Sequence, residues 1–185
     1  MFGLTSRREP AARAPHLAVQ LADWECNVTA IEISIVHPGT TEIAICARWR
    51  VEEFAGVLGS SFEAERRTLD AFTGGQAHQV ALIARRDGAP AGTCPLVPSE
   101  IDPVHSVSPW LAGLYVTPEH RRFGVGQALV RAIEAAAKDR GNARLYLYTD
   151  NAIGFYERLG WRVIDRVMWK GFHTALMLCD LQELT

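Results

Sequence analysis

The chain has 185 residues, 48% of them hydrophobic and 22% charged, which is the balance of one globular domain with a short appended segment. Its 19 basic and 21 acidic residues give a net charge of −2, so no broad positive field would draw it to nucleic acid or to an anionic membrane. The sequence has no apolar run near the ~20 residues that cross a bilayer, and residues 1–15 lack the apolar core of a signal peptide. We therefore expect a cytoplasmic protein.

The first part of the chain predicts a partly flexible segment followed by a strand. Residues 1–28 form the expected N-terminal segment, with a short helix over His16–Val28, and residues 29–185 form the expected domain. Within Ile31–Val36, isoleucine alternates with polar residues, and a His-Pro-Gly turn signal follows. This pattern predicts the first strand.

Two helices are expected next, because suitable capping residues precede two helical patterns. A threonine at residues 40–41 can cap a first helix that runs to about Phe54. A serine at residues 60–61 can cap a second helix, Phe62–Phe72, and the glycine pair at residues 74–75 would end it.

A β-hairpin is predicted where the apolar runs Val80–Arg85 and Ala91–Val97 flank Asp87-Gly88, since Asp-Gly is a strong reverse-turn signal. Pro95 inside the second run, and the proline that opens the loop Pro98–Pro109, predict that this strand is irregular or ends early, because proline cannot donate to a sheet. The loop is long enough to carry function.

The hydrophobic pattern becomes sharper after Trp110. Residues Leu111–Val116 predict a strand, and a Thr-Pro-Glu turn leads to an amphipathic helix over Gly126–Arg140, closed by Gly141 in the position that favours a left-handed cap. The apolar stripe of this helix comprises Leu129, Ala132, Ile133, Ala136 and Ala137. Its expected solvent side comprises Gln127, Arg131, Glu134 and Lys138.

The last part of the chain predicts three strands and a short helix. Leu145–Thr149 is a strand, Ala152–Leu159 a helix that ends at a glycine, and Val163–Met168 with Ala175–Leu181 a closing pair of strands. Strand, helix and strand at this spacing imply a right-handed parallel crossover from Leu111–Val116 to the next strand. We therefore predict one α+β domain with a mixed, mostly antiparallel sheet flanked by helices.

The cysteines are scattered along the chain without CxxC or Cys/His ligand spacing. This arrangement predicts reduced core thiols and no metal site. They are Cys26, Cys46, Cys94 and Cys179.

The most informative turn has the sequence RRFGVG and spans residues 121–126. Two glycines at alternate positions let the backbone approach a ligand, and the start of the following helix is an anion site to which Arg121 and Arg122 add charge. A pyrophosphate is the expected guest. Taken alone, the pattern fits a plain tight turn equally well. It is no dinucleotide fingerprint, because Leu129 fills the third glycine position, and it lacks the Lys-Ser/Thr pair of a P-loop.

The pattern Arg121-x-x-Gly124-x-Gly126 resembles the [RQ]-x-x-G-x-[GA] acyl-CoA signature of the GNAT N-acetyltransferase superfamily. The resemblance implies a GNAT-like sheet with one splayed parallel strand pair, and acetyl-CoA as cosubstrate. It also implies that backbone N–H groups of the turn hold the pyrophosphate and that the preceding strand pairs with pantetheine. Phe123 departs from the family, where many members carry a polar or basic residue, which would weaken adenosine contacts. The implied cofactor-binding residues are Leu114, Tyr115, Val116, Arg121, Arg122, Phe123, Gly124, Val125, Gly126, Gln127, Asn151 and Tyr156.

A second stretch, Tyr148–Trp161, resembles the family's other signature, in which an Asn begins a short helix that carries Phe-Tyr and ends in Leu-Gly-aromatic. This implies that Tyr156 is the general acid, because a phenol of pKa near ~10 stays protonated and can give its proton to the departing thiolate. Asn151 is implied to contact pantetheine, to cap the helix, or both. Core packing is the alternative role of Tyr156, which shares an apolar stripe with Phe155.

The acceptor side and the general base are left open by the sequence. Glu100, Asp102 and His105 lie in the loop before the strand, where they could attract a cationic amine or accept its proton. Trp110 could wall the acceptor slot. The alternative for the first three is a solvated loop residue, and the alternative for Trp110 is to cover the end of the sheet.

These patterns together predict an N-acetyltransferase that moves the acetyl group from acetyl-CoA to a primary amine of a small molecule or peptide. Direct attack is expected, because no cysteine lies beside either motif. The alternative is a catalytically silent CoA-binding regulatory module. An RNA-associated acceptor has no support in the acidic charge balance. The resemblance also implies that a homodimer could form through the sheet edge, whereas nothing in the sequence identifies the amine.

Overall fold

A computed structural model describes residues 30–73, 79–100 and 102–183 of the chain. The helix expected over residues 16–28 lies outside these residues, as does Cys26. The described elements are, in chain order, β1 (Ile31–Ile35), α1 (Thr41–Leu58), α2 (Phe62–Thr73), β2 (Val80–Arg86), β3 (Ala89–Val97), β4 (Trp110–Leu111), β5 (Tyr115–Val116), the 3-10 turn η1 (Pro118–His120), α3 (Val125–Asp139), β6 (Arg144–Thr149), α4 (Ile153–Glu157), β7 (Arg162–Trp169) and β8 (Phe172–Asp180).

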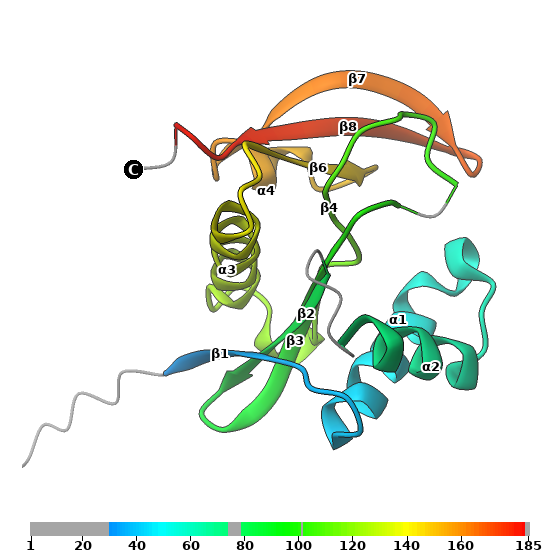
Figure 1. Ribbon diagram of the computed structural model, residues 1–185, viewed down its shortest axis with the longest axis vertical. Coiled ribbons are helices and arrows are strands. Elements are labelled where there is room, and N and C mark those ends of the chain that lie inside the picture. The colour runs from blue at the N-terminus through cyan, green and yellow to red at the C-terminus, as the bar shows by residue number, and fades with distance from the viewer. Residues whose placement is uncertain (1–29, 74–78, 101, 184–185) are drawn as a thin grey trace, which may run out of the picture.

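The strands form one sheet in the order β1-β2-β3-β4-β6-β8-β7, with β5 paired to β3 beside β4 (Figure 1). Neighbouring strands are antiparallel except β4 and β6, which are parallel and meet where Trp110 pairs with Tyr146. The predicted α+β fold with one parallel strand pair is therefore confirmed.

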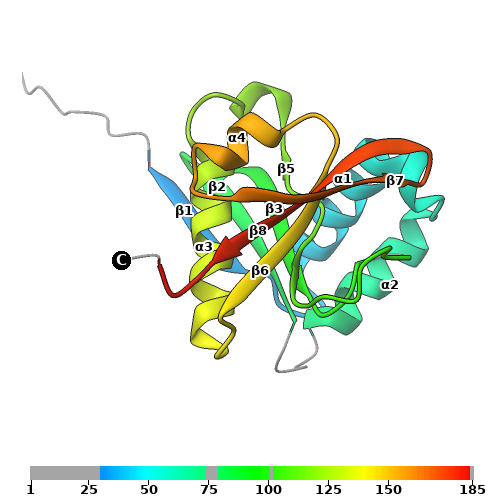
Figure 2. The same ribbon diagram turned by 90° about the horizontal axis from the view of Figure 1, so that it is seen from above.

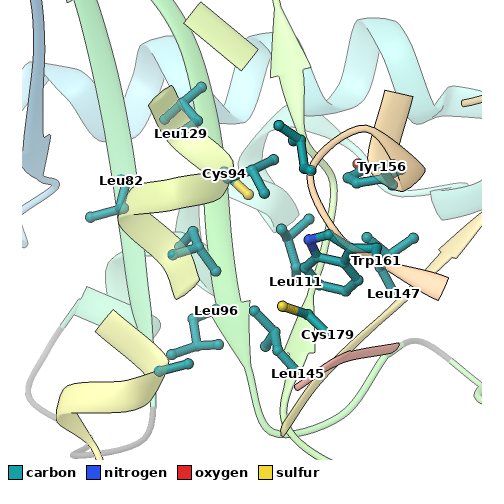
Figure 3. Close-up of a cluster of buried hydrophobic side chains, with 14 of the residues drawn as sticks. Leu82, Cys94, Leu96, Leu111, Leu129, Leu145, Leu147, Tyr156, Trp161 and Cys179 are labelled. Atoms are coloured by element: carbon teal, nitrogen blue, oxygen red, sulfur yellow. The ribbon is translucent and has the colours of Figure 1, made fainter. Parts of the chain in front are cut away.

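Helices cover both faces of the sheet, and β2 shows how the sequence directs this arrangement (Figures 1 and 2). Val80, Leu82 and Ala84 pack in one buried cluster with residues of α3, whereas Ala81 and Ile83 pack in a second cluster with α1 and α2. A strand buried on both faces reads as a continuous apolar run, as this one does. The larger cluster, drawn in Figure 3, joins α3, α4 and the centre of the sheet.

The single strand expected over residues 111–116 is wrong, because the structure divides it into β4 and β5. Between them the backbone leaves the ladder, and Gly113 takes a left-handed φ of 58°. β4 remains beside β6, but the described pairing of β5 is with β3 alone, through Gly92 and Thr93. The edge of β5 that faces β6 is therefore left open to a ligand.

The early or irregular end expected for the strand at Pro95 is also wrong, since β3 continues to Val97. The backbone N–H of Ala112 donates to the carbonyl of Pro95 at 3.0 Å, so Pro95 presents its nitrogen toward the same side. The N–H group that Pro95 lacks would therefore point toward the gap between β4 and β5, next to Gly113, where the hydrogen-bond ladder of β3 is already interrupted.

The solvent side expected for α3 is wrong at Glu134, which is only 2% exposed. Its carboxylate accepts hydrogen bonds from the indole N–H of Trp161 at 2.7 Å and from the Arg131 guanidinium at 2.8 Å. A buried carboxylate with such partners is stable, so hydrophobic periodicity alone could not identify it.

The predicted turns and caps are mostly confirmed. Asp87 and Gly88 both have positive φ, at 54° and 79°, as the tight hairpin requires, and Gly141 caps α3 at φ 79°. The first helix runs beyond its expected end at Phe54 to Leu58, with a break in helical geometry at Phe54. Among the described cysteines the thiols are free and buried: Cys46, Cys94 and Cys179.

Candidate active site

A groove of about 660 Å³ lies where β5, the start of α3 and α4 meet. We call it the α3 groove. Of the twelve residues predicted to bind the cofactor, the structure brings eight together here: Leu114, Tyr115, Val116, Arg121, Arg122, Gly124, Gly126 and Gln127. The remaining lining residues are Glu53, Ala152, Phe155, Arg158 and Leu159.

The turn before α3 has the backbone geometry of an anion site. Arg122 and Gly124 take left-handed φ values of 68° and 85°, so the chain folds sharply into the helix. The N–H of Ala128 donates to the Gly124 carbonyl at 2.9 Å, which makes Gly124 the N-cap of α3. The N–H groups of the first turn precede this bond and have no partner within the helix. Gly126 and Gln127 of this first turn line the groove, so the positive end of the helix dipole lies beside it.

Arg121 links the turn to β5 and to α1. Its Nε–H donates to the Val116 carbonyl at 3.0 Å, and its Nη2 lies 3.7 Å from the Glu53 carboxylate. Pantetheine pairing at Val116 would therefore require Arg121 to release that carbonyl. Because Arg121 is half-exposed, this ion pair contributes little to stability and can exchange for a phosphate.

Four of the twelve predicted cofactor residues do not line the groove, and two of these, Phe123 and Val125, lie in the turn itself. Val125 is buried in the core, so it can offer only its backbone N–H. Phe123 is 54% exposed, and the Arg86 guanidinium lies 3.8 Å from its ring centroid. Arg86 thus brings a cation to the turn that the motif does not contain, because it comes from the end of β2.

A second cavity, of about 350 Å³, adjoins the groove on the side of the β7–β8 hairpin. We call it the hairpin cavity. Glu53 lines both spaces, and Gly113 and Asn151 of the cavity are followed directly in the chain by Leu114 and Ala152 of the groove. The cavity is lined by Arg50, Glu53, Phe54, Glu100, Ala112, Gly113, Tyr148, Thr149, Asp150, Asn151, Trp169, Phe172 and Thr174.

The four residues predicted for the acceptor side have different fates. Glu100 lines the hairpin cavity. Asp102 lies on the surface instead, with its carboxylate 3.4 Å from Lys170 Nζ and 85% of its side chain exposed. Trp110 is fully buried, so its predicted place in the wall is wrong; its ring lies 4.8 Å from that of Tyr148, which itself lines the cavity.

His105, the fourth, belongs to a chain of hydrogen bonds that begins at the cavity wall. The Tyr148 oxygen accepts the backbone N–H groups of Val104 and His105 at 3.1 and 3.2 Å, and lies 2.8 Å from His105 Nδ1. His105 Nε2 lies 2.9 Å from the Asp165 carboxylate. Since an ionised carboxylate only accepts, Nε2 carries the proton and Tyr148 donates to Nδ1.

The pKa values at the two ends of this hydrogen-bond chain, Tyr148 and Asp165, are shifted in opposite directions. Burial raises the pKa of Tyr148 above its ordinary value, against the two backbone N–H groups that lower it. The hydrogen bond from His105 holds the pKa of Asp165 below its usual range. At neutral pH the chain therefore runs from a neutral phenol to an ionised carboxylate at the surface.

Asn151 is exposed and lines the hairpin cavity, not the α3 groove. The N-cap of α4 is Ala152, so the capping role considered for Asn151 is wrong. The Thr149 hydroxyl instead accepts the Ala152 N–H at 3.1 Å, which satisfies a donor at the start of the helix.

Tyr156 lies in the core beside Trp161 (Figure 3). The neighbouring residue on α4, Phe155, lines the groove. Tyr156 is 6% exposed, and burial raises its pKa well above the ordinary value. Among the described residues, no hydrogen bond to its hydroxyl contributes to this pKa. Both roles considered for Tyr156, core packing and proton donation, agree with this position.

Sequence reasoning missed an ion pair behind the hairpin cavity. Arg50 Nε donates to the Glu65 carboxylate at 2.9 Å, and the Ser60 hydroxyl donates to the other oxygen at 2.7 Å. Both charged side chains are more than nine-tenths buried. Glu65 had the helical spacing of a solvated residue, so only the packing of α1 on α2 could reveal it.

Three comparisons with known proteins agree with this geometry. The family described as "Acetyltransferase (GNAT) family" matches residues 44–161. N-acetyltransferase 8B of Homo sapiens is 29% identical over 106 residues, which cover 55% of this chain and 45% of that protein. The chain thus spans about half the length of the curated relatives it matches.

Among solved structures, an aminoglycoside 6'-acetyltransferase type Ii superposes with a TM-score of 0.65 at 19% identity, over 81% of this chain and 97% of that one. An aminoglycoside 6'-N-acetyltransferase complexed with coenzyme A gives a TM-score of 0.63 at 16% identity, over 81% and 97%. These likenesses establish a shared fold. The family match covers more than half of the chain, including the turn at residues 121–126 and all of α4, and the chain therefore belongs to the GNAT acetyltransferase family.

Proposed function

We propose that the protein is an N-acetyltransferase that transfers the acetyl group of acetyl-CoA to a primary amine of a small molecule or peptide by direct attack. The observation that carries the proposal is the turn of Arg122 and Gly124 at the start of α3, which lies at one end of a groove that leads to a second cavity. A related fold was solved with coenzyme A, which supports the choice of cosubstrate.

In this proposal the α3 groove takes the CoA moiety. The N–H groups of the first turn of α3 bind the pyrophosphate, and Arg122, Arg158 and Arg86 supply positive charge around it. The open edge of β5 pairs with the pantetheine amides as an added strand. The thioester then lies near Gly113 and Leu114, where groove and cavity adjoin.

Tyr156 is proposed to protonate the leaving thiolate. Its raised pKa keeps the phenol protonated throughout the neutral range, and no hydrogen bond among the described residues competes for that proton. Direct transfer needs no acyl-enzyme. The described cysteines are unsuited to form one, since they are buried and burial raises the pKa of the Cys46 thiol to about 11.

The hairpin cavity is proposed to hold the amine. The carboxylates of Glu53, Glu100 and Asp150 line it, together with aromatic rings, which suits an ammonium group on a partly apolar body. The ammonium must lose a proton before it attacks. We assign this step to Tyr148, which would pass its own proton to His105 Nδ1 as it accepts one from the amine, while Asp165 stabilises the resulting imidazolium.

The experiment is thiol release from acetyl-CoA with a panel of primary amines, comparing the wild type with Tyr156→Phe. We expect turnover with at least one amine and a kcat that is about 100-fold lower in the variant, the range for loss of one general acid. The affinity for CoA should be unchanged. CoA binding without thiol release for any amine would favour the silent CoA-binding module instead.

A homodimer and a cytoplasmic location remain proposals. No described helix has the length and apolar character to cross a membrane. The edge strand β7 exposes Ile164 and Met168, which gives a homodimer an apolar surface to use. Sedimentation of the purified chain would test the dimer.

A further inference from the structure

The acyl transfer reaction creates a negative oxygen, and none of the side chains assigned above stabilises it. When the amine attacks the thioester carbonyl carbon, the C–N bond forms and the carbonyl π electrons move to oxygen. The oxyanion then collapses, the C–S bond breaks, and the thiolate takes a proton from Tyr156. The new amide nitrogen loses one proton, which restores the phenol of Tyr156. A donor placed where that oxygen develops lowers the barrier of both steps.

Arg50, in α1, has a side-chain donor that no described residue uses. Its Nε is bonded to Glu65, but its Nη1 is buried and has no hydrogen-bond partner among the described residues. A buried N–H group of a charged side chain without a partner is costly and rare. Arg50 lines the hairpin cavity, although only 8% of its side chain is exposed.

Gly113 brings this donor to the junction of the two spaces. A Cβ added at Gly113 would collide with Arg50 Nη1, so the guanidinium packs directly against the backbone where β4 and β5 separate. Gly113 lines the hairpin cavity and the next residue, Leu114, lines the α3 groove. The left-handed backbone and the missing side chain of Gly113 are both needed for this contact.

We propose that Arg50 Nη1 donates to the thioester oxygen and stabilises the oxyanion of the tetrahedral intermediate. This inference rests on the proposed acetyltransferase function. The Glu65 carboxylate fixes the plane of the guanidinium through Nε and offsets its charge. A guanidinium whose charge is balanced by Glu65 suits an oxygen that is neutral in the substrate and negative only in the tetrahedral intermediate, because the hydrogen bond then strengthens as that charge develops. Arg50 is a catalytic residue in this assignment, and Glu65 a positioning residue.

The first test is Arg50→Lys, which keeps a cation for Glu65 and removes the second donor group. Acetyl transfer to the amine and acetyl-CoA hydrolysis measured without amine would both pass through the oxyanion, so both rates should fall about 100-fold. The affinity for CoA should stay within about threefold, since the ground state is little affected. Arg48→Lys, the same change on an exposed arginine of the same helix, should leave both rates unchanged.

A second pair of variants addresses folding. In Arg50→Gln the carboxylate of Glu65 is left buried and alone, which destabilises the protein, whereas Arg50→Gln/Glu65→Gln removes both charges. The double variant should fold, bind CoA and show the same loss of both rates.

Two outcomes would overturn the proposal. If Arg50→Lys raises the KM for the amine but leaves hydrolysis intact, Arg50 recognises the acceptor and not the oxyanion. If the wild type turns over and Arg50→Lys keeps both rates, Arg50 has only a structural role. A wild-type protein that binds no CoA would refute the acetyltransferase function itself, which CoA titration detects separately.

Discussion

The α3 groove and the hairpin cavity share Glu53 and adjoin at residues 113–114, yet they are built in different ways. The groove depends on the backbone: a turn with two left-handed residues, the first N–H groups of a helix, and a strand edge. The cavity depends on side chains from α1, the loop before β4, β6 and the β7–β8 hairpin. A common cosubstrate can be bound by backbone geometry, whereas acceptor recognition requires individual side chains.

The largest effect is expected when the turn at the start of α3 is changed, because the α3 groove is proposed to bind CoA through that turn. In Gly124→Glu, a side chain enters a left-handed position and adds a negative charge where the pyrophosphate is expected. Because like charges in contact cost several kcal/mol, we expect CoA affinity to fall at least about 100-fold, or ~3 kcal/mol. Calorimetric titration with CoA measures the loss.

Gly141→Glu is the matched control for that substitution. Gly141 has a similar left-handed φ of 79° and open space around it, but it lies at the opposite end of α3. Both variants should lose similar stability, and only Gly124→Glu should lose CoA affinity. An equal loss of affinity in the two variants would mean that the turn acts through helix stability alone.

The backbone of the turn contains no titratable group, whereas α1, which lines the hairpin cavity, carries the buried thiol of Cys46. Burial raises the pKa of Cys46 from 9.0 to about 11. The folded state therefore holds this proton more tightly than the unfolded state, so its contribution is complete below pH 9 and is lost as pH rises toward 11. Within that window we expect stability to fall by about 1.4 kcal/mol per pH unit from this thiol.

Denaturant unfolding at several pH values checks the sign. Cys46→Ala should be less stable at pH 7 because it leaves a small void, but its stability should decline less steeply between pH 9 and 11. Parallel curves for the two proteins would show that the thiol does not ionise on unfolding in this range.

A smaller effect is expected from the aromatic rim of the cavity. Phe172→Ala removes a partly exposed ring that lines the space, and the KM for the amine should rise about 5- to 10-fold, or ~1 kcal/mol, with CoA affinity unchanged. Met168→Ala, on the same hairpin but outside the cavity lining, should change neither quantity. A loss of CoA affinity in Phe172→Ala would show that the two spaces are not independent.

The same contrast explains what could be predicted from the sequence. Glycines, capping residues and apolar periodicity are local signals, and they predicted the sheet, the hairpin turn and the residues 121–126 turn. The division at Gly113 could not be predicted, because it depends on β3 and β6 pairing with different parts of one segment. Sequence spacing likewise could not show that Trp110 lies behind Tyr148 or that Glu65 is buried against Arg50.

The proposed function depends above all on whether acetyl-CoA is consumed by transfer to an amine. The purified chain would be incubated with isotopically labelled acetyl-CoA and the amine panel, and the amine products and free CoA would be quantified together by mass spectrometry. We predict that one amine gains the labelled acetyl group in a one-to-one ratio with CoA released. Tight CoA binding with no acetylated product from any amine would contradict the assignment and leave the silent CoA-binding module as the better description.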